Sequence, residues 1–328
     1  MMSRRAMMHL LSATTIATIA HLRETASAVE QQPPLSKRLG VQMYMLGQIS
    51  PSELPGVLKQ VREIGFLEVE ALPRPDLPEQ VFRAELDRVG MTSPSCHIAL
   101  EPMAPGMLSL ADTPAAIEYA RTIGATQIVV PMFPFARALL ARANGAARPA
   151  DPDKARSAIA SVAQSMSAAD WIEVARSLNE AAAKLAPTGI RLGYHNHNLE
   201  FVPVGDGKVA LDLLISHTDP KLVDMELDIG WVKAAGYDPA AFLKQHAHRI
   251  TQVHLKDLAP TPANTALQLN TTELGHGVQD WPSIVEAIQS TSIRHAYIEQ
   301  EPPYTVSGLK SAAEDYAFIQ PLLARKDI

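Results

Sequence analysis

The feature that most constrains the fold of this chain is an eightfold alternation of strand-like and helix-like patterns. The expected strands cover residues 39–45, 66–71, 92–100, 127–132, 190–195, 222–228, 250–256 and 293–299. A helix-forming segment follows each strand, so the strands must lie parallel. Eight parallel strands close naturally into a barrel, which predicts the α/β class and a single-domain (β/α)8 barrel. An open doubly wound sheet competes, but the first strand lacks the glycine-rich phosphate loop of a dinucleotide site.

Capping residues predict where several helices begin. Ser50 is expected to cap a helix, with Glu53 closing a capping box. Ser167 and Asp170 predict a second cap within the Ala-rich region 136–186. Further helices are expected over 78–89, 113–124, 209–217, from 238 onwards, over 281–289 and over 307–323.

The first residues resemble an export signal of the twin-arginine type. Ser3-Arg4-Arg5 precedes a modestly apolar segment, and Ala26-Ser27-Ala28 is a small-x-small cleavage pattern. We therefore predict an export signal over 1–28, a linker over 29–38 and the barrel over 39–328. The mature protein is expected in the periplasm or otherwise exported, whereas a leader without function would leave it in the cytoplasm.

Composition and charge exclude several classes of protein. Hydrophobic residues make up 47% of the chain, and the mature part has no apolar run long enough to span a bilayer. The net charge of −6, with no Lys/Arg-rich stripe, argues against a nucleic-acid partner. Cys96 is the only cysteine, so no intramolecular disulfide can form. The sequence leaves open whether the protein forms a homo-oligomer.

Ionisable side chains gather at the carboxyl ends of six expected strands, where the loops of a barrel carry its functional groups. These ends read Glu68-Val69-Glu70, Ser95-Cys96-His97, His195-Asn196-His197, Glu226-Leu227-Asp228, His254-Leu255-Lys256-Asp257 and Glu299-Gln300-Glu301. Any one has an ordinary structural explanation, but burying all of them unpaired would be costly. Imidazoles mixed with carboxylates indicate a divalent metal and suit Mn, Fe, Co, Ni or Zn better than Ca or Mg.

Four pieces of the sequence resemble the xylose isomerase-like TIM-barrel superfamily, the sugar phosphate isomerases and epimerases. The pieces are Tyr194-His195-Asn196-His197, Leu227-Asp228-Ile229-Gly230-Trp231, Val253-His254-Leu255-Lys256-Asp257 and Tyr297-Ile298-Glu299-Gln300. The loop Gly275-His276-Gly277 and the His-Leu-Lys-Asp piece are characteristic in combination. The similarity covers essentially the whole mature chain. In that family, strands five to eight usually donate Glu, Asp, His and Glu to one metal ion.

The resemblance implies one divalent ion held by His195, Asp228, His254 and Glu299. The family's first Glu falls on His195, and there this sequence departs from the pattern. The usual sequence reads Glu-x-His, so His197 matches the family's substrate-contacting histidine. Glu301 shares a strand face with Glu299 and is the alternative for the last ligand.

The resemblance also implies proton abstraction next to a carbonyl of a sugar or keto-sugar, through an enediolate. Family epimerases place two ligand glutamates on opposite faces of the reacting carbon. His195 leaves that pair incomplete, with Glu299 as the remaining base. A one-base isomerisation, or deprotonation followed by β-elimination from a 3-keto-glycoside, is therefore more attractive than two-glutamate epimerisation.

Other strand-end residues receive catalytic or substrate-binding roles. The catalytic candidates are Glu299, Lys256 and His197, and the substrate-binding candidates are Glu70, His97, His197, Trp231, Lys256 and Glu301. Lys256 would polarise the carbonyl or protonate a leaving group. Trp231 would stack on a sugar face or only pack against the following helix. His276 receives no role.

Two rival classes of function remain on the sequence alone. Endonuclease IV shares this barrel, but it needs a basic DNA-binding face. The other rival is a noncatalytic barrel that only binds a sugar. No Arg/Lys cluster falls in the strand-end loops, although Arg137 and Arg142 would contribute to phosphate binding if their segment folds over the barrel mouth.

Overall fold

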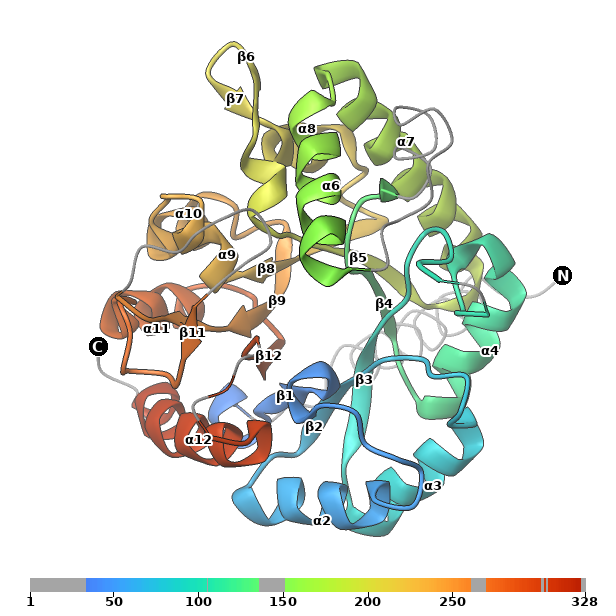
Figure 1. The fold of residues 1–328 in the computed structure, drawn as a ribbon, viewed down its shortest axis with the longest axis vertical. Helices are drawn as coiled ribbons and strands as arrows, with labels where there is room; N and C mark the ends of the chain where they lie inside the picture. The colour runs from blue at the N-terminus through green and yellow to red at the C-terminus, as the bar shows by residue number, and fades with distance from the viewer. Residues whose placement is uncertain are drawn as a thin grey trace, which may run out of the picture. The chain divides into compact units, whose positions relative to one another are not determined.

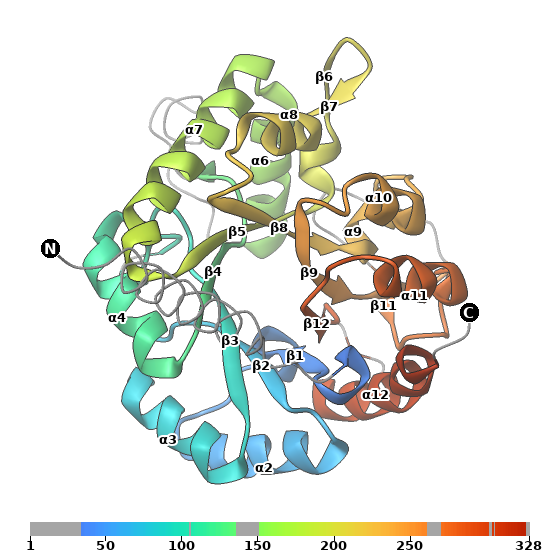
Figure 2. The same ribbon diagram turned by 180° about the vertical axis from the view of Figure 1, so that it is seen from behind.

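The computed structural model describes residues 34–104, 106–135, 151–260, 270–301, 304 and 306–325. Eight parallel strands close into a barrel in the order β1-β12-β9-β8-β5-β4-β3-β2. They are β1 (Gly40–Gln42), β2 (Glu68–Ala71), β3 (Thr92–His97), β4 (Gln127–Val130), β5 (Arg191–His195), β8 (Val223–Asp228), β9 (Ile250–Leu255) and β12 (His295–Ile298). The predicted (β/α)8 barrel is thus confirmed, with an inner ring of strands and helices outside it (Figures 1 and 2).

Ten α-helices lie in the described residues, and all of them except α9 lie where the alternating pattern predicts a helix. They are α2 (Leu54–Ile64), α3 (Glu79–Val89), α4 (Thr113–Ile123), α6 (Pro152–Ser165), α7 (Ala168–Leu185), α8 (Ala210–His217), α9 (Ile229–Ala234), α10 (Pro239–Gln245), α11 (Trp281–Gln289) and α12 (Gly308–Ala324). Among the described residues, no helix combines the length and the apolarity that a membrane span needs.

Successive side chains of each strand point to opposite faces, so apolar residues pack against the helices while polar residues point into the barrel interior. Val69 and Cys96 are fully buried on the strand faces that pack against helices. Their neighbours Glu70 and Ser95 lie on the opposite face, where the Ser95 hydroxyl donates to Glu70 at 2.6 Å. Burial raises the pKa of the Cys96 thiol, so this group stays a neutral part of the core.

The two predicted helix caps have different outcomes. The Ser167–Asp170 capping box is confirmed, with the Ser167 amide donating to Asp170 at 2.7 Å. The predicted helix start at Ser50 is wrong by one turn. Glu53 does accept from the Ser50 amide at 2.9 Å, but this pair closes a turn, and α2 begins only at Leu54.

The first strand is shorter than predicted, because the side chain of its last residue caps a 3-10 helix directly after it. Gln42 accepts a hydrogen bond from the Tyr44 amide at 3.1 Å and caps the 3-10 helix η2 (Met43–Leu46). Residues predicted as strand therefore turn at the barrel mouth.

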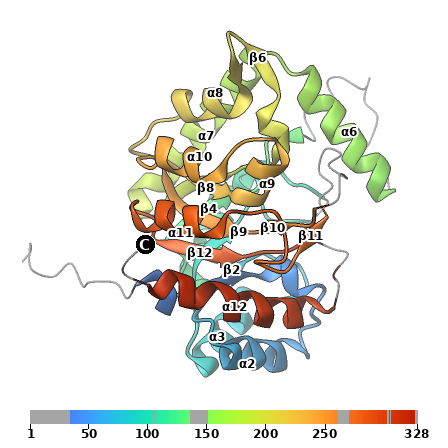
Figure 3. The same cartoon turned by 90° about the vertical axis from the view of Figure 1, so that its left-hand side faces the viewer.

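Several short elements that the alternating pattern did not predict follow the strands. They are α9, the 3-10 helix η5 (Asn198–Phe201), the hairpin of β6 (Pro203–Gly205) with β7 (Lys208–Val209), and the hairpin of β10 (Asp257–Leu258) with β11 (Thr271–Thr272). In the side view, α6 and the β10–β11 hairpin lie at the end toward which the barrel strands run (Figure 3).

The predicted export signal lies outside the described residues. Within the predicted linker, Leu35–Lys37 form a 3-10 helix, η1, which packs against α12. The described residues from Leu35 onward therefore belong to one folded unit.

Candidate metal and substrate site

The carboxyl ends of four neighbouring strands bring two imidazoles and two carboxylates together. β5, β8, β9 and β12 are consecutive in the barrel, and the register pairs Asp228 directly with His254. One ligand atom from each of His195, Asp228, His254 and Glu299 lies within 4.8 Å of the others, and all four residues are buried. This is the set that the family resemblance implies, and we call it the outer cluster.

The spacing within the outer cluster fits a metal ion. His254 Nδ1 lies 2.9 Å from Glu299 Oε2, and His195 Nε2 lies 3.9 Å from Asp228 Oδ2. An ion bound at about 2.0–2.2 Å from each ligand separates neighbouring ligand atoms by roughly 3–4 Å. The two distances fall in or next to that range, so these residues can hold a divalent ion without a large rearrangement.

Lys256 extends beside the outer cluster and is completely buried. Its Nζ lies 2.8 Å from Asp228 Oδ2, 3.0 Å from Glu299 Oε2 and 3.2 Å from Glu301 Oε1. Burial alone would lower the pKa of Lys256, but Asp228, Glu299 and Glu301 raise it well above its usual value. The site therefore contains a fixed ammonium next to the carboxylates.

Gly230 provides the room for this lysine. A Cβ at position 230 would stand 2.7 Å from the Cγ of Lys256 and 2.8 Å from its Cβ. The glycine of the Leu-Asp-Ile-Gly-Trp piece is thus explained by the close passage of a buried side chain.

Two ring nitrogens next to Lys256 are buried and have no hydrogen-bond partner among the described residues. They are Nδ1 of His197 and Nε1 of Trp231, whose rings lie 5.1 Å apart. Lys256 Nζ lies 5.2 Å from the centre of the Trp231 ring. Burial and the charge of Lys256 lower the pKa of His197 to about 3, so its ring is neutral.

A second group of side chains lies on the other edge of the same imidazole rings. His97, His195, Glu226 and His254 offer one atom each within 4.8 Å, all buried, and we call them the inner cluster. Glu226 Oε1 lies 2.9 Å from His97 Nε2, 3.0 Å from His195 Nδ1 and 3.1 Å from His254 Nε2. Sequence reasoning gave Glu226 no role. The signal was present, since Glu226 precedes Asp228 by two residues and shares its strand face.

The carboxylates of the inner region hold the imidazoles in place. Glu70 accepts from Gln42 at 2.8 Å, and its Oε2 lies 2.7 Å from His254 Nε2. Burial would lower the pKa of His97, but Glu70 and Glu226 raise it to about 10. Burial likewise opposes ionisation of Glu226, yet His254 and His195 lower its pKa to about 2.

Two polar residues fix the segment that follows β5. Asn196 accepts from the Asp228 amide at 3.0 Å and ties β5 to β8 just where the ligands leave the strands. Glu200 is fully buried and accepts from the Tyr194 hydroxyl at 2.6 Å and from the His197 amide at 2.8 Å. Burial raises the pKa of Glu200 to about 7. Sequence reasoning missed Glu200, because nothing local marks a buried Glu beyond a strand end.

Asp257 explains why the His-Leu-Lys-Asp piece and the Gly-x-Gly loop occur together. Its carboxylate accepts from the amides of Gly275 at 3.0 Å and Gly277 at 3.3 Å, and from Trp281 Nε1 at 2.8 Å. A Cβ on Gly277 would lie 2.2 Å from Asp257 Oδ1 and 2.3 Å from the Leu258 carbonyl oxygen. His276, between the two glycines, is exposed.

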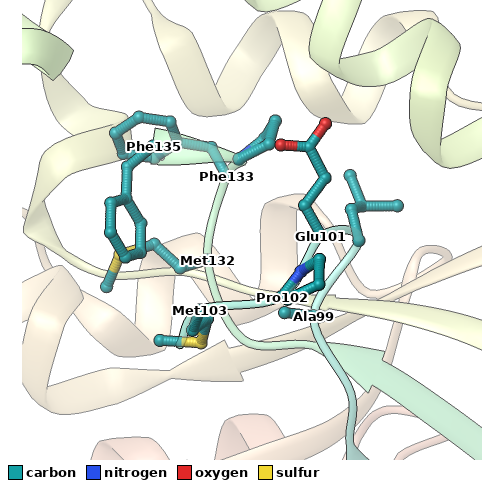
Figure 4. A pocket seen from close by; sticks show the side chains of 9 residues that line it. Ala99, Glu101, Pro102, Met103, Met132, Phe133 and Phe135 are labelled. Carbon is teal, nitrogen blue, oxygen red and sulfur yellow. The ribbon is translucent and has the colours of Figure 1, made fainter. Parts of the chain in front are cut away.

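A small apolar hollow lies where β3 and β4 end (Figure 4). Its volume is about 250 Å3, including the part that is open to solvent. It is lined by Ala99, Leu100, Glu101, Pro102, Met103, Met132, Phe133, Pro134 and Phe135. Glu101 is the single ionisable residue of this lining, so the hollow offers apolar contact area rather than proton transfer.

The predicted substrate-binding residues lie in different places. Glu301 contacts Lys256 and is not part of the outer cluster, which favours Glu299 over Glu301 as the ligand. Glu70 is fully buried among side-chain partners, and this position suits holding His254 better than the predicted contact with a sugar hydroxyl. His97 likewise faces Glu70 and Glu226 inside the barrel. Arg137 and Arg142 lie outside the described residues.

Comparisons with known proteins agree with this architecture. A stretch of 91 residues is 35% identical to the inosose dehydratase of Clostridium botulinum, and it covers 28% of this chain and 30% of that protein. A sugar phosphate isomerase/epimerase from Parabacteroides distasonis shares the fold with a TM-score of 0.63 at 20% identity, over 90% of this chain and 98% of that one. A Mycobacterium smegmatis barrel in complex with magnesium gives a TM-score of 0.59 at 18% identity, over 87% and 96%.

A family model covers far more of the chain than any of these sequence matches. Residues 58–322 match the model of the xylose isomerase-like TIM barrel. The described strands β2 to β12 and the outer cluster all lie within that range. The chain therefore belongs to the xylose isomerase-like TIM barrel family.

Proposed function

We propose that this protein is a metal-dependent carbohydrate enzyme that removes a proton next to a carbonyl group of a sugar or keto-sugar. The observation that carries the proposal is the outer cluster, in which two imidazoles and two carboxylates converge beside a buried ammonium. When bound there, a divalent ion would polarise the substrate carbonyl and stabilise the negative charge on the deprotonated substrate.

The charges of the site support a bound cation. The carboxyl groups of five residues gather around a site in which Lys256 supplies a permanent cation; they belong to Glu70, Glu226, Asp228, Glu299 and Glu301. Without a metal, the neighbouring carboxylates raise the pKa values of His97 and His254, which favours protonated imidazoles that balance part of this negative charge. A divalent ion would supply the same positive charge, and the mixed ligands suit Mn, Fe, Co, Ni or Zn.

Glu299 is the proposed general base. Burial opposes its ionisation, but Lys256 and His254 lower its pKa well below the usual value and keep it a carboxylate. Glu299 takes the proton from the carbon next to the carbonyl, and the electrons of the broken C–H bond delocalise onto the carbonyl oxygen. The ammonium of Lys256 lies 3.0 Å from Glu299 Oε2 and is therefore close to the reacting carbon, where it stabilises the negative charge that develops on the carbonyl oxygen.

We favour β-elimination as the next step. The electrons return from the carbonyl oxygen and form a C=C bond between the α-carbon and the β-carbon. The bond from the β-carbon to its oxygen substituent breaks, and the leaving oxygen takes a proton from Lys256 or Glu301. Burial raises the pKa of Glu301, so this carboxyl keeps a proton to higher pH than an ordinary Glu. The match to an inosose dehydratase supports elimination, and His195 stands where a second glutamate would return a proton.

His197 and Trp231 are the proposed substrate contacts. Their unpartnered Nδ1 and Nε1 atoms lie beside Lys256, and a sugar hydroxyl would satisfy them. This arrangement suits an unphosphorylated sugar, because both groups are neutral hydrogen-bonding partners.

Isomerisation is the second candidate. The fold shared with a sugar phosphate isomerase/epimerase supports it, and one base can return the proton to the adjacent carbon. The products separate the two reactions. Elimination from a 3-keto-glycoside would release the aglycone and form an unsaturated ketone with strong ultraviolet absorption, whereas isomerisation would release nothing.

The test is to incubate the protein, loaded with Mn2+ or Co2+, with a panel of keto-sugars and 3-keto-glycosides. We expect release of the aglycone or of water, dependent on the metal and lost in Glu299→Gln. Interconversion without release would establish the second candidate. A barrel that binds these sugars but changes none of them would contradict both and support the noncatalytic alternative.

A further inference from the structure

We propose that the inner cluster is a second cation position, which a single transition-metal ion such as Zn2+ occupies as an alternative to the outer cluster. Its three imidazoles and one carboxylate come from β3, β5, β8 and β9 and are all buried. This inference concerns metal binding and does not require that the protein be an enzyme.

The distances in the inner cluster match the coordination shell of an ion. Glu226 Oε1 lies 2.9–3.1 Å from the three ring nitrogens of His97, His195 and His254. An octahedral ion with bonds of about 2.1 Å separates adjacent ligand atoms by roughly 3.0 Å. Glu70 Oε2 lies 2.7 Å from His254 Nε2 and 3.1 Å from His97 Nε2, so it can supply a fifth ligand atom.

Hydrogen bonding alone would need a hydrogen on each of these three ring nitrogens. His97 Nε2 and His195 Nδ1 would donate to Glu226 Oε1, and His254 Nε2 would donate to Glu70 Oε2 at 2.7 Å. The other oxygen of Glu226, Oε2, accepts from Gln252 at 3.1 Å. A cation between the nitrogens and the carboxylates satisfies every one of these atoms at the same time.

Two rings are shared between the clusters, and this makes the positions exclusive. His195 directs Nδ1 to Glu226 and Nε2 to Asp228, while His254 directs Nε2 to the inner cluster and Nδ1 to Glu299. A neutral imidazole has one nitrogen lone pair to offer, so each ring binds an ion on one side only. When the ion lies in the outer cluster, the inner carboxylates accept the ring N–H groups instead.

The ligands also differ in the metal they prefer. The inner cluster offers three imidazoles, whereas the outer cluster offers two imidazoles and two carboxylates. Imidazole-rich sites suit Zn2+, and carboxylate-rich sites suit Mn2+. Zn2+ should therefore favour the inner cluster more strongly than Mn2+ does.

Zn2+ binding to the Glu299→Gln variant tests the inner position, because this change removes a ligand from the outer cluster and none from the inner cluster. We expect one Zn2+ per chain, with three imidazole ligands by X-ray absorption spectroscopy. Adding His97→Gln should weaken Zn2+ binding at least about tenfold. His197→Gln is the matched control, since His197 belongs to neither cluster, and it should leave the Zn2+ affinity unchanged.

Loss of Zn2+ binding in Glu299→Gln, or only two imidazoles in its spectrum, would overturn the inner position. So would unchanged affinity after His97→Gln. If the double variant fails to fold by circular dichroism, the imidazole count of the single variant decides. These measurements use no substrate, so a failure of the proposed enzymatic function would leave their outcome unaffected.

Discussion

His195 has the most consequential position in the proposed site, because the family resemblance implies a ligand glutamate at this point of the chain. Its ring contacts Glu226 through Nδ1 at 3.0 Å and faces Asp228 through Nε2 at 3.9 Å. An imidazole here could ligate a metal ion but could not act as the second carboxylate of an epimerase. This single residue therefore favours one-base chemistry.

Replacing His195 by Ala should remove metal from the protein. The variant loses one ligand of the outer cluster and one of the imidazoles that contact Glu226, so metal affinity should fall at least about tenfold. Metal content after dialysis, measured by mass spectrometry, provides the test. His197→Ala is the matched control and should keep its metal. Equal metal content in His195→Ala and the unmodified protein would remove His195 from the site.

Much of the site at this scale was predictable, because ligands on parallel strands follow the strand ends. His195, Asp228, His254 and Glu299 converge as the resemblance implies. The roles of Glu70 and Glu226 were not predictable in the same way. Their function depends on which imidazole lies across the barrel, and sequence spacing within one strand carries no information about that.

At the scale of elements, Asp257 organises the Gly-His-Gly loop and the start of α11. Substituting Gly277 by Ala should destabilise the protein by about 1–3 kcal/mol, because the added Cβ meets the Leu258 carbonyl, a backbone atom that cannot move freely. Urea unfolding measures the change.

Gly56→Ala is the control for this substitution. Gly56 is exposed within α2, and a Cβ there has no atom within 4 Å. Because Ala is the better helix former, this variant should gain up to about 1 kcal/mol. Equal free energies of unfolding for Gly277→Ala and the parent would show that the loop adjusts without strain.

A buried carboxyl in α12 should make stability depend on pH. Asp315 accepts from the Leu274 amide at 2.6 Å, and burial raises its pKa to about 8. The unfolded chain loses this proton near pH 4, so between these values the folded state binds more protons than the unfolded one. The contribution of Asp315 to the free energy of unfolding is therefore fully present below about pH 4, and it is lost as the pH rises to about 8.

Asp315→Asn keeps the hydrogen-bond acceptor and removes the titrating group. The parent protein should lose more free energy of unfolding between pH 5 and pH 8 than this variant loses, as measured by urea titration at both values. Parallel losses in the two proteins would show that Asp315 is ionised in the folded state.

Element boundaries were less predictable than element types. The eight strands and their helices lie where the alternating pattern predicts, because each apolar run must reach the barrel wall. β1 ends early because Gln42 caps η2. α9 begins at Ile229, directly after β8, because Asp228 caps it and its Oδ1 accepts from the Trp231 amide at 3.0 Å. Both effects come from one side chain bonding to a backbone amide, which a periodic pattern does not record.

At the scale of the whole molecule, export stays a prediction from residues 1–28, which lie outside the described structure. Replacing Arg4 and Arg5 by Lys should retain the protein in the cytoplasm of a bacterial host, because twin-arginine signals need the arginine pair. Cell fractionation and mass spectrometry of the mature N-terminus measure this. The unmodified protein should appear in the periplasm, cut after Ala28. Identical distribution of both proteins would contradict the predicted leader.

The barrel as a whole combines an apolar outer packing layer with an interior that carries charge at its carboxyl end. Burying charged groups costs free energy unless they are paired. Here carboxylates, imidazoles and the Lys256 ammonium pair with one another. This concentration of paired charge is typical of a reaction site and is more than a simple sugar-binding surface requires.

Solvent deuterium exchange tests the central claim most directly. The metal-loaded protein, in D2O with keto-sugars and 3-keto-glycosides, should incorporate deuterium at the carbon next to the carbonyl of its substrate. Glu299→Gln should retain most of its metal, because His195, Asp228 and His254 remain. It should lose exchange by about 100-fold or more. Undiminished exchange in the metal-loaded Glu299→Gln variant would contradict the proposed base, and no exchange by the unmodified protein into any substrate would contradict proton abstraction itself.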